Sequence, residues 1–206
     1  QYLLTGLASY CDDDATMTIN VVRTPVSGVA VAPISYCAGD NQVVTLASLI
    51  TGEDGGGMWN ESSQNPSTGG AFNPATGTFN IVAQAPGVYR FDYIIMGTGP
   101  CPDDMTTVEV VIEANPIADA GNTSTLTCVI PTTTVGGAGS SIGPNFSYTW
   151  VASAGGVIVA GEENLPVATV TSAGTYTLTV LNTVTGCSAT DQVVIGQIGT
   201  FPTDLI

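Results

Sequence analysis

The chain has 206 residues and a formal net charge of -15; 17 residues are acidic, only Arg23 and Arg90 are basic, and lysine and histidine do not occur. These absences remove the commonest general base, the amine that forms Schiff bases and the lysine of phosphate-binding loops, so we expect no enzymatic activity. The negative charge repels nucleic acid, and no stretch approaches the roughly 20 apolar residues of a spanning helix. We therefore expect no nucleic-acid partner and no membrane span in this segment.

Short β-strands separated by turns account for the local pattern of the sequence. The runs 78–84, 89–96, 107–114 and 175–182 are rich in β-branched and aromatic residues that partly alternate with polar ones. Stretches rich in glycine, asparagine and proline separate such runs. No stretch has the 3.6-residue period of an amphipathic helix. The sequence predicts an all-β fold.

The cysteine positions reveal an internal repeat. Cysteines lie at positions 11, 37, 101, 128 and 187, so that gaps of 26, 64, 27 and 59 residues alternate between short and long. Trp59 follows Cys37 by 22 residues, and Trp150 follows Cys128 by the same 22 residues. The chain therefore repeats with a period of 86–90 residues. We name the cysteines by their place in the repeat: the early cysteines are Cys37 and Cys128, and the late cysteines are Cys11, Cys101 and Cys187.

The repeat divides the chain into units. In chain order, we expect residues 1–23 to be the C-terminal strands of a truncated unit, 24–114 a complete unit, 115–197 another, and 198–206 the start of the next. The two complete stretches are called here the second unit (24–114) and the third unit (115–197). Neighbouring repeats of the same chain are the first partners that this organisation predicts.

Each complete unit resembles the immunoglobulin-like (Ig-like) and PKD-like sandwich domains. The resemblance lies in about seven strand-like runs, a tryptophan near the third, and the motif Gly-x-Tyr at the entry to the sixth, with Tyr89 and Tyr176 as its tyrosines. It implies tandem Ig-like β-sandwiches in which Trp59, Trp150, Tyr89 and Tyr176 belong to the cores. Where antibody domains carry the second cysteine of their inter-sheet disulfide, this chain has Phe91 and Leu178, so that bond is absent.

The cysteines themselves favour disulfides over a metal site, because no Cys-x-x-Cys pair and no histidine occurs. The repeat predicts one bond within each complete unit, Cys37 with Cys101 and Cys128 with Cys187. Cys11 would be unpaired within this fragment, its partner lying about 60 residues upstream. Disulfides indicate an oxidising compartment, so we expect an exported protein.

Acidic clusters are the remaining candidates for a bound ion. They lie in predicted turns at Asp12, Asp13 and Asp14, at Asp103 and Asp104, at Glu53 with Asp54, and at Glu162 with Glu163. Calcium is the ion that carboxylate oxygens would take, but none of the clusters has the Asp-x-Asp-x-Asp-Gly spacing of a dedicated calcium loop. We expect solvated turns and no cofactor, with calcium as the alternative.

The wording of the repeats, above all ADAGNTSTLTC, YTW and SAGTYTLTVLNTVTGCSATDQVVI, resembles the tandem domains of giant surface proteins of Bacteroidota. This resemblance implies type IX secretion and an extracellular, cell-surface location. It further implies a stalk segment of an adhesin or filament appendage that mediates attachment, gliding or capture of prey or surfaces, and whose chains could assemble into a homo-oligomeric filament. The alternative is a carbohydrate- or protein-binding module, in which Trp59 or Trp150 would stack on a glycan.

Overall fold

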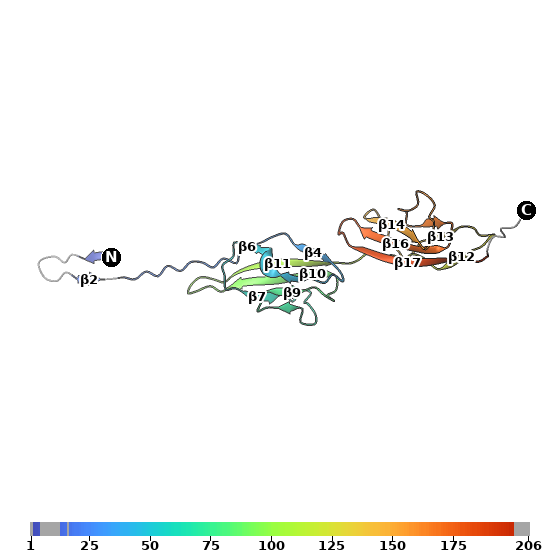
Figure 1. Ribbon diagram of the computed structural model, residues 1–206. Coiled ribbons are helices and arrows are strands. Elements are labelled where there is room, and N and C mark those ends of the chain that lie inside the picture. Colours follow the sequence, from blue (N-terminus) through green and yellow to red (C-terminus); the bar gives the residue numbers. More distant parts are fainter. Residues whose placement is uncertain (1, 5–12, 16, 200–206) are drawn as a thin grey trace, which may run out of the picture.

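A computed structural model describes residues 2–4, 13–15 and 17–199 of the chain, and within them two β-sandwiches follow one another along the molecule (Figure 1). The described residues contain no α-helix, only one 3-10 helix of four residues, so the predicted all-β fold is confirmed. No helix in the described part is long and apolar enough to cross a membrane.

The second unit contains nine of the described strands. Their bounds are β3 Val29–Ala30, β4 Ile34–Cys37, β5 Val43–Thr45, β6 Ile50–Thr51, β7 Met58–Glu61, β8 Phe72–Asn73, β9 Thr78–Asn80, β10 Gly87–Ile95 and β11 Asp104–Glu113, with the 3-10 helix η1 at Leu46–Leu49. One sheet has the order β4-β11-β10-β7, and a second has the order β5-β9-β8. In the larger sheet β4 runs parallel to β11, the last strand of the unit in the sequence, with Cys37 opposite Glu113. The other pairs in that sheet are antiparallel.

The third unit repeats this topology with fewer strands. Its strands are β12 Ser124–Leu126, β13 Thr133–Val135, β14 Phe146–Ser153, β15 Ala168–Val170, β16 Gly174–Asn182 and β17 Ser188–Gln197. The larger sheet has the order β12-β17-β16-β14, and in it β12 runs parallel to β17, the last strand of the unit. Strands β13 and β15 pair in the facing sheet. This is the Ig-like arrangement of two facing sheets, in which the third, sixth and seventh strands share one sheet.

Two further strands, β1 (Tyr2–Leu4) and β2 (Asp13–Ala15), pair antiparallel at the N-terminal end of the chain. Beyond them, residues 17–28 lie in no strand and lead into the second unit (Figure 1). The exact unit boundaries stay predictions.

Alternation along the long strands builds two separate cores. In β10, every second residue from Tyr89 to Ile95 is buried, and the same holds for Tyr176, Leu178 and Val180 in β16. Side chains on successive strand residues point to opposite faces, so this alternation buries one face of the sheet against the other sheet. The two clusters of buried residues share no member. Each unit therefore has a hydrophobic core of its own.

The positions that hold cysteine in antibody domains are packed with apolar side chains. Phe91 and Leu178 are both completely buried. Phe91 contacts the rings of Phe72 and Phe79 at centroid distances of 5.0 and 4.9 Å. Aromatic packing thus occupies the place where an inter-sheet disulfide would otherwise connect the two layers.

Candidate functional site

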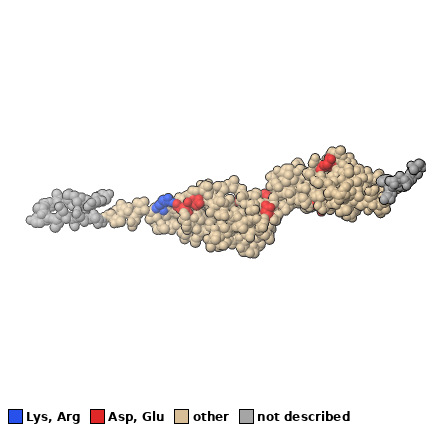
Figure 2. Space-filling view, in the orientation of Figure 1, with Lys and Arg blue, Asp and Glu red and all other residues tan. Residues whose placement is uncertain are grey.

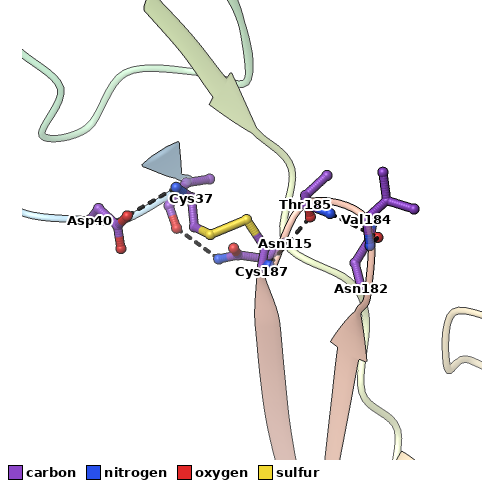
Figure 3. Close-up of a disulfide and its surroundings, with 8 residues drawn as sticks. Cys37, Asp40, Asn115, Asn182, Val184, Thr185 and Cys187 are labelled. Carbon is purple, nitrogen blue, oxygen red and sulfur yellow. Dashed lines mark hydrogen bonds between the residues drawn. A yellow bond between two sulfur atoms is a disulfide. The ribbon is translucent and has the colours of Figure 1, made fainter. Parts of the chain in front are cut away.

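A disulfide between Cys37 and Cys187 joins the second unit to the third (Figure 3). Cys37 is the last residue of β4, and Cys187 precedes the first residue of β17. Their Cα atoms lie 5.5 Å apart, although the two residues are separated by 150 positions in the sequence. The bond therefore connects the early cysteine of one unit to the late cysteine of the unit that follows it.

The pairings predicted from the repeat, Cys37 with Cys101 and Cys128 with Cys187, are therefore wrong. Cys101 and Cys128 are free thiols in the structure, the first half-buried and the second exposed. Each unit consequently has no disulfide of its own, contrary to expectation. Cys11 lies outside the described residues.

The parallel pairing of first and last strands explains why a bond within one unit cannot form. Cys37 lies opposite Glu113, the last residue of β11, whereas Cys101 precedes Asp104, the first residue of that strand. A ten-residue strand spans about 30 Å at roughly 3.3 Å per residue. Disulfides require Cα atoms within about 7 Å of each other, so the two cysteines of one unit are much too far apart.

The third unit keeps its two cysteines apart in the same way. Leu126, two residues before Cys128, lies opposite Gln197 at the end of β17. Cys187 lies at the other end of that ten-residue strand. In both units the early cysteine is thus found at the end of the sandwich where the chain leaves the unit, and the late cysteine at the end where the chain enters it.

A compact turn between β16 and β17 presents Cys187. The side-chain oxygen of Asn182 accepts hydrogen bonds from the backbone N–H groups of Val184 (3.0 Å) and Thr185 (3.3 Å). Asn182 also donates its backbone N–H to the carbonyl of Cys187 at 2.8 Å, and Gly186 takes the positive φ of +77° that closes the turn. Cys187 is only 1 % exposed. Its sulfur is therefore held in place and largely out of solvent.

Backbone hydrogen bonds hold the Cys37 side of the junction. Asp40 accepts a hydrogen bond from the N–H of Cys37 at 2.9 Å (Figure 3). Ala38 donates its N–H to the carbonyl of Glu113 at 2.8 Å, and its own carbonyl accepts from the side chain of Asn115 at 2.7 Å. Asn115 lies in the connection between the two units. The segment after Cys37 is thereby tied to the chain as it leaves the second unit.

The four aromatic residues assigned to the cores lie inside the sandwiches. Trp59 and Trp150 are 7 % and 3 % exposed, and Tyr89 and Tyr176 are buried. The hydroxyl of Tyr89 donates to the carbonyl of Ala85 at 2.8 Å. The hydroxyl of Tyr176 donates to the carbonyl of the equivalent residue, four positions upstream, at 2.6 Å. Such a bond to the preceding corner is typical of Ig-like sandwiches.

The acidic calcium candidates bind backbone instead of each other. Asp103 accepts from the N–H of Gly97 at 2.8 Å, and Asp104 accepts from the N–H and the hydroxyl of Ser27 at 2.7 and 2.9 Å. The backbone donor, followed by the hydroxyl, holds the pKa of Asp104 below its usual value. Within the described residues no group of three or more metal-ligating side chains occurs.

The remaining acidic candidates are placed as follows. Asp12 lies outside the described residues, and Asp13 and Asp14 belong to β2. Asp54 forms an ion pair with Arg23, and the guanidinium holds the pKa of this carboxyl below its usual value. Figure 2 shows oppositely charged atoms meeting at the end of the second unit nearest its N-terminal linker, on a face that is otherwise poor in charge. The turn predicted for Asp13 and Asp14 is wrong, because both lie in a strand. Asp54, Glu162 and Glu163 each accept a hydrogen bond from a backbone N–H group, that of Val26, Thr169 and Gly161 respectively.

A groove beside Trp59 was not predicted. It has a volume of about 200 Å³ and is lined by Glu53, Trp59, Thr76 and Tyr93, together with small residues. Tyr93 fixes its wall, because its hydroxyl accepts from the N–H of Gly57 at 3.0 Å and donates to the carbonyl of Asp54 at 2.9 Å. No spacing in the sequence marks this loop arrangement, although the sequence kept a glycan-stacking tryptophan as the alternative to a core residue.

Comparisons with known proteins find similarity among solved structures alone. No family model matches, and no curated protein matches. A PKD domain solved in solution is 27 % identical, with a TM-score of 0.31, over 42 % of this chain and 92 % of that domain. An I-band fragment of titin is 14 % identical, with a TM-score of 0.38, over 84 % of this chain and 63 % of the fragment.

A SusE-like surface-located polysaccharide-binding protein from Bacteroides thetaiotaomicron is 9 % identical, with a TM-score of 0.40, and aligns over 84 % of this chain. The chain spans only 34 % of that protein's length. None of these three proteins is named as an enzyme.

Proposed function

We propose that the chain is a segment of a structural stalk in a large extracellular adhesin or cell-surface filament. The observation that carries this proposal is the bond between Cys37 and Cys187, which holds two successive units together. Each unit has a hydrophobic core of its own, so the bond adds a connection between units. A covalent link between units strengthens the connection between neighbouring units. A stalk needs such strength because it is pulled along its length.

The bond changes how the chain responds to tension. A force applied at the two ends passes directly from Cys37 to Cys187, and the residues between them stay outside the stretched path. With 150 positions between the cysteines, the withheld length is on the order of 500 Å at about 3.5 Å per extended residue. The two units therefore resist extension as one covalently closed block.

Chemistry and resemblance support the location of this stalk. A disulfide persists in an oxidising compartment, which fits an extracellular or cell-surface protein. The likeness of the repeats to giant Bacteroidota surface proteins supports export by type IX secretion and a role in attachment, gliding or prey and surface capture. Neighbouring repeats would be the immediate partners, and chains could associate into a homo-oligomeric filament.

Single-molecule stretching of the oxidised chain between handles at its two ends tests the proposal. We expect the Cys37→Ser, Cys187→Ser double variant to reach an extended length on the order of 500 Å greater than the parent chain. The matched control is the Cys101→Ser, Cys128→Ser variant, which keeps the bond and should extend like the parent. Equal extended lengths for all three chains would contradict the stalk mechanism.

The groove beside Trp59 favours a second candidate function, binding of a glycan or peptide. An indole edge, a tyrosine and polar groups from Glu53 and Thr76 line it. Because Glu53 and the net charge are negative, the occupant would be neutral or cationic.

Tryptophan fluorescence can test this alternative, because the chain has only two tryptophans. In the Trp150→Phe variant Trp59 is the only reporter, whereas in Trp59→Phe only Trp150 remains. Binding of a neutral oligosaccharide in the groove should change the emission of the first variant and leave the second unchanged. A panel of neutral oligosaccharides and cationic peptides that changes neither would remove this function.

A further inference from the structure

The residues that the structure describes include one bonded pair of cysteines and two free ones, and the repeat relates all four. Cys101 has the place in the second unit that Cys187 has in the third, in the turn before the last strand. Cys128 has the place in the third unit that Cys37 has in the second, because Cys37 ends the strand that pairs in parallel with the last strand and Cys128 lies two residues beyond the end of its counterpart. Each free thiol is therefore the counterpart of a bonded one.

We propose that Cys128 and Cys101 are the two halves of the same inter-unit disulfide at the neighbouring junctions of an array. Cys128 would bond the late cysteine of a following unit, and Cys101 the early cysteine of a preceding unit. The stalk would then carry a ladder of disulfides in which every early cysteine binds the late cysteine of the next unit. The inference rests on the proposed stalk only in requiring that units continue in tandem.

An apolar surface surrounds the exposed Cys128 and supports this assignment. Val129 is 89 % exposed, and Ile130 and Ile198 are exposed beside the same end of the third unit. They lie close to one another, because Thr127 donates its N–H to the carbonyl of Ile130 and Ile198 donates to Leu126, at 2.9 Å each. Apolar residues clustered on a surface mark a contact site. We assign the final turn of a following unit as the occupant of this surface. The chain itself contains one such contact, in which the turn that carries Cys187 is bonded to the end of the second unit.

The turn that carries Cys101 is shaped for the other half of such a contact. Asp103 accepts from the N–H of Gly97, and Cys101 donates its N–H to the carbonyl of Thr98 at 3.3 Å. Its thiol is only half-buried, whereas the bonded Cys187 at the equivalent place is 1 % exposed. A bond to a preceding unit would leave Cys101 as buried as the bonded Cys187.

The chemistry is an oxidation of two thiols by a dithiol–disulfide oxidant of the export compartment, or by oxidised glutathione in a test tube. Both S–H bonds are lost and one S–S bond forms between Cys128 and the late cysteine. The two electrons and two protons reduce one disulfide of the oxidant to two thiols, so the exchange balances.

Such a ladder has a mechanical consequence that a single bond lacks. Each closed loop would span 150 positions. Successive loops would overlap, because one loop ends at the late cysteine of a unit and the next loop has already begun at the early cysteine of that same unit. Under tension, the force would leave one bond at a late cysteine and enter another at the next early cysteine. The stretch between two such cysteines is short, 27 positions in the case of Cys101 and Cys128. The stalk would be nearly inextensible along its whole length.

A tandem chain tests the inference directly. Residues 1–201 are followed by residues 25–206, so that the second copy's Pro25 takes the place of Pro202 and Cys101 of the second copy lies 150 positions after Cys128 of the first. That is the separation of Cys37 and Cys187. The purified tandem chain is equilibrated with oxidised and reduced glutathione, remaining thiols are alkylated, and disulfide-linked peptides are identified by mass spectrometry. The matched control carries Cys101→Ser in the second copy.

We expect a linked peptide pair between Cys128 of the first copy and Cys101 of the second in most molecules, and an alkylated Cys128 in the control. The Cys37–Cys187 pair within each copy reports that the units have folded and docked. If that pair forms while Cys128 and the second Cys101 are both alkylated, the ladder is wrong and the stalk proposal stands. A bond between Cys128 and any other cysteine overturns the ladder as well. If the Cys37–Cys187 pair itself is absent, both proposals fail.

Discussion

The second and third units share one framework and differ in what surrounds it. In both, the first and last strands pair in parallel, a tryptophan lies in the core, and a tyrosine hydroxyl bonds the corner four residues upstream. Trp150 is sealed, because its indole N–H donates to the carbonyl of Leu165 at 3.0 Å. Trp59 instead borders an open groove. The framework thus maintains the fold, and the segments around it are where the units diverge.

The final turns differ in the same manner. In the third unit, Cys187 is 1 % exposed and bonded to the second unit, whereas Cys101 in the second unit is half-buried and carries a free thiol. The two turns have equivalent places in the fold, and they differ in that one cysteine is bonded to a neighbouring unit and the other is free. The comparison teaches that the unit alone does not determine the state of its cysteines.

The largest expected effect comes from removing the bond that distinguishes the two turns. The Cys37→Ser, Cys187→Ser variant loses a closed loop of 150 positions, which the chain-entropy relation values at about 5 kcal/mol. The Cys101→Ser, Cys128→Ser variant should unfold within about 0.5 kcal/mol of the parent, as expected for sites without a structural role. Urea unfolding of the oxidised proteins measures both. Equal losses of unfolding free energy in the two variants would contradict the difference between the two turns.

Replacing each tryptophan with phenylalanine sharpens the contrast between the cores. Trp150→Phe removes the hydrogen bond that the indole N–H donates to the carbonyl of Leu165. Among the described residues the indole N–H of Trp59 has no such partner, so Trp59→Phe loses no indole hydrogen bond. Because Leu165 is itself 46 % exposed, loss of this hydrogen bond costs up to about 1.5 kcal/mol. We expect Trp150→Phe to be the more destabilising by about that amount in chemical unfolding. The reverse order would contradict the distinction between a sealed and a bordered tryptophan.

The corner tyrosines predict a smaller difference. The Tyr176 hydroxyl both donates to the carbonyl of Ser172 and accepts from the N–H of Val157 at 3.0 Å, whereas that of Tyr89 makes one bond, to Ala85. Tyr176→Phe should therefore cost about 1 kcal/mol more than Tyr89→Phe, the net value of one hydrogen bond. Thermal melts of both variants measure the difference. Identical melting temperatures would show that the extra bond contributes nothing.

The smallest effect concerns acid. Hydrogen bonds from Ser27 lower the pKa of Asp104 in the folded chain, so this carboxylate contributes stability above its unfolded pKa of about 3.9, and the contribution disappears as the pH falls through the folded pKa. The melting temperature of Asp104→Asn should lie below that of the parent at pH 7, and the gap should close below about pH 4. Ser27→Ala, which retains the backbone donor, should show part of this change. Parallel curves for parent and Asp104→Asn at every pH would refute it.

The all-β fold could be predicted from the sequence, because the alternation of apolar and polar residues and the turn residues are local signals. The equal spacing of Trp59 and Trp150 from the early cysteines indicated core positions, and the structure places both there. The disulfide pairing could not be read in the same way, because joining the two cysteines of one unit ignored the direction of the strands. Parallel pairing of β4 with β11 carries Cys37 to the far end of the sandwich, and this is a tertiary fact.

The groove and the apolar end around Cys128 escaped prediction for a related reason. Residues from three separated segments, represented by Glu53, Thr76 and Tyr93, meet only when both sheets are folded. Val129 and Ile130 resemble any short apolar run until the fold leaves them exposed. Surfaces assembled from distant segments leave no periodic trace in a single sequence.

Disulfide mapping of the oxidised 206-residue chain tests the account most directly. The protein is alkylated, digested without reduction, and analysed by mass spectrometry for cysteine-linked peptides. The account predicts a peptide pair that joins Cys37 to Cys187. Peptide pairs that join Cys37 to Cys101 and Cys128 to Cys187 would contradict it.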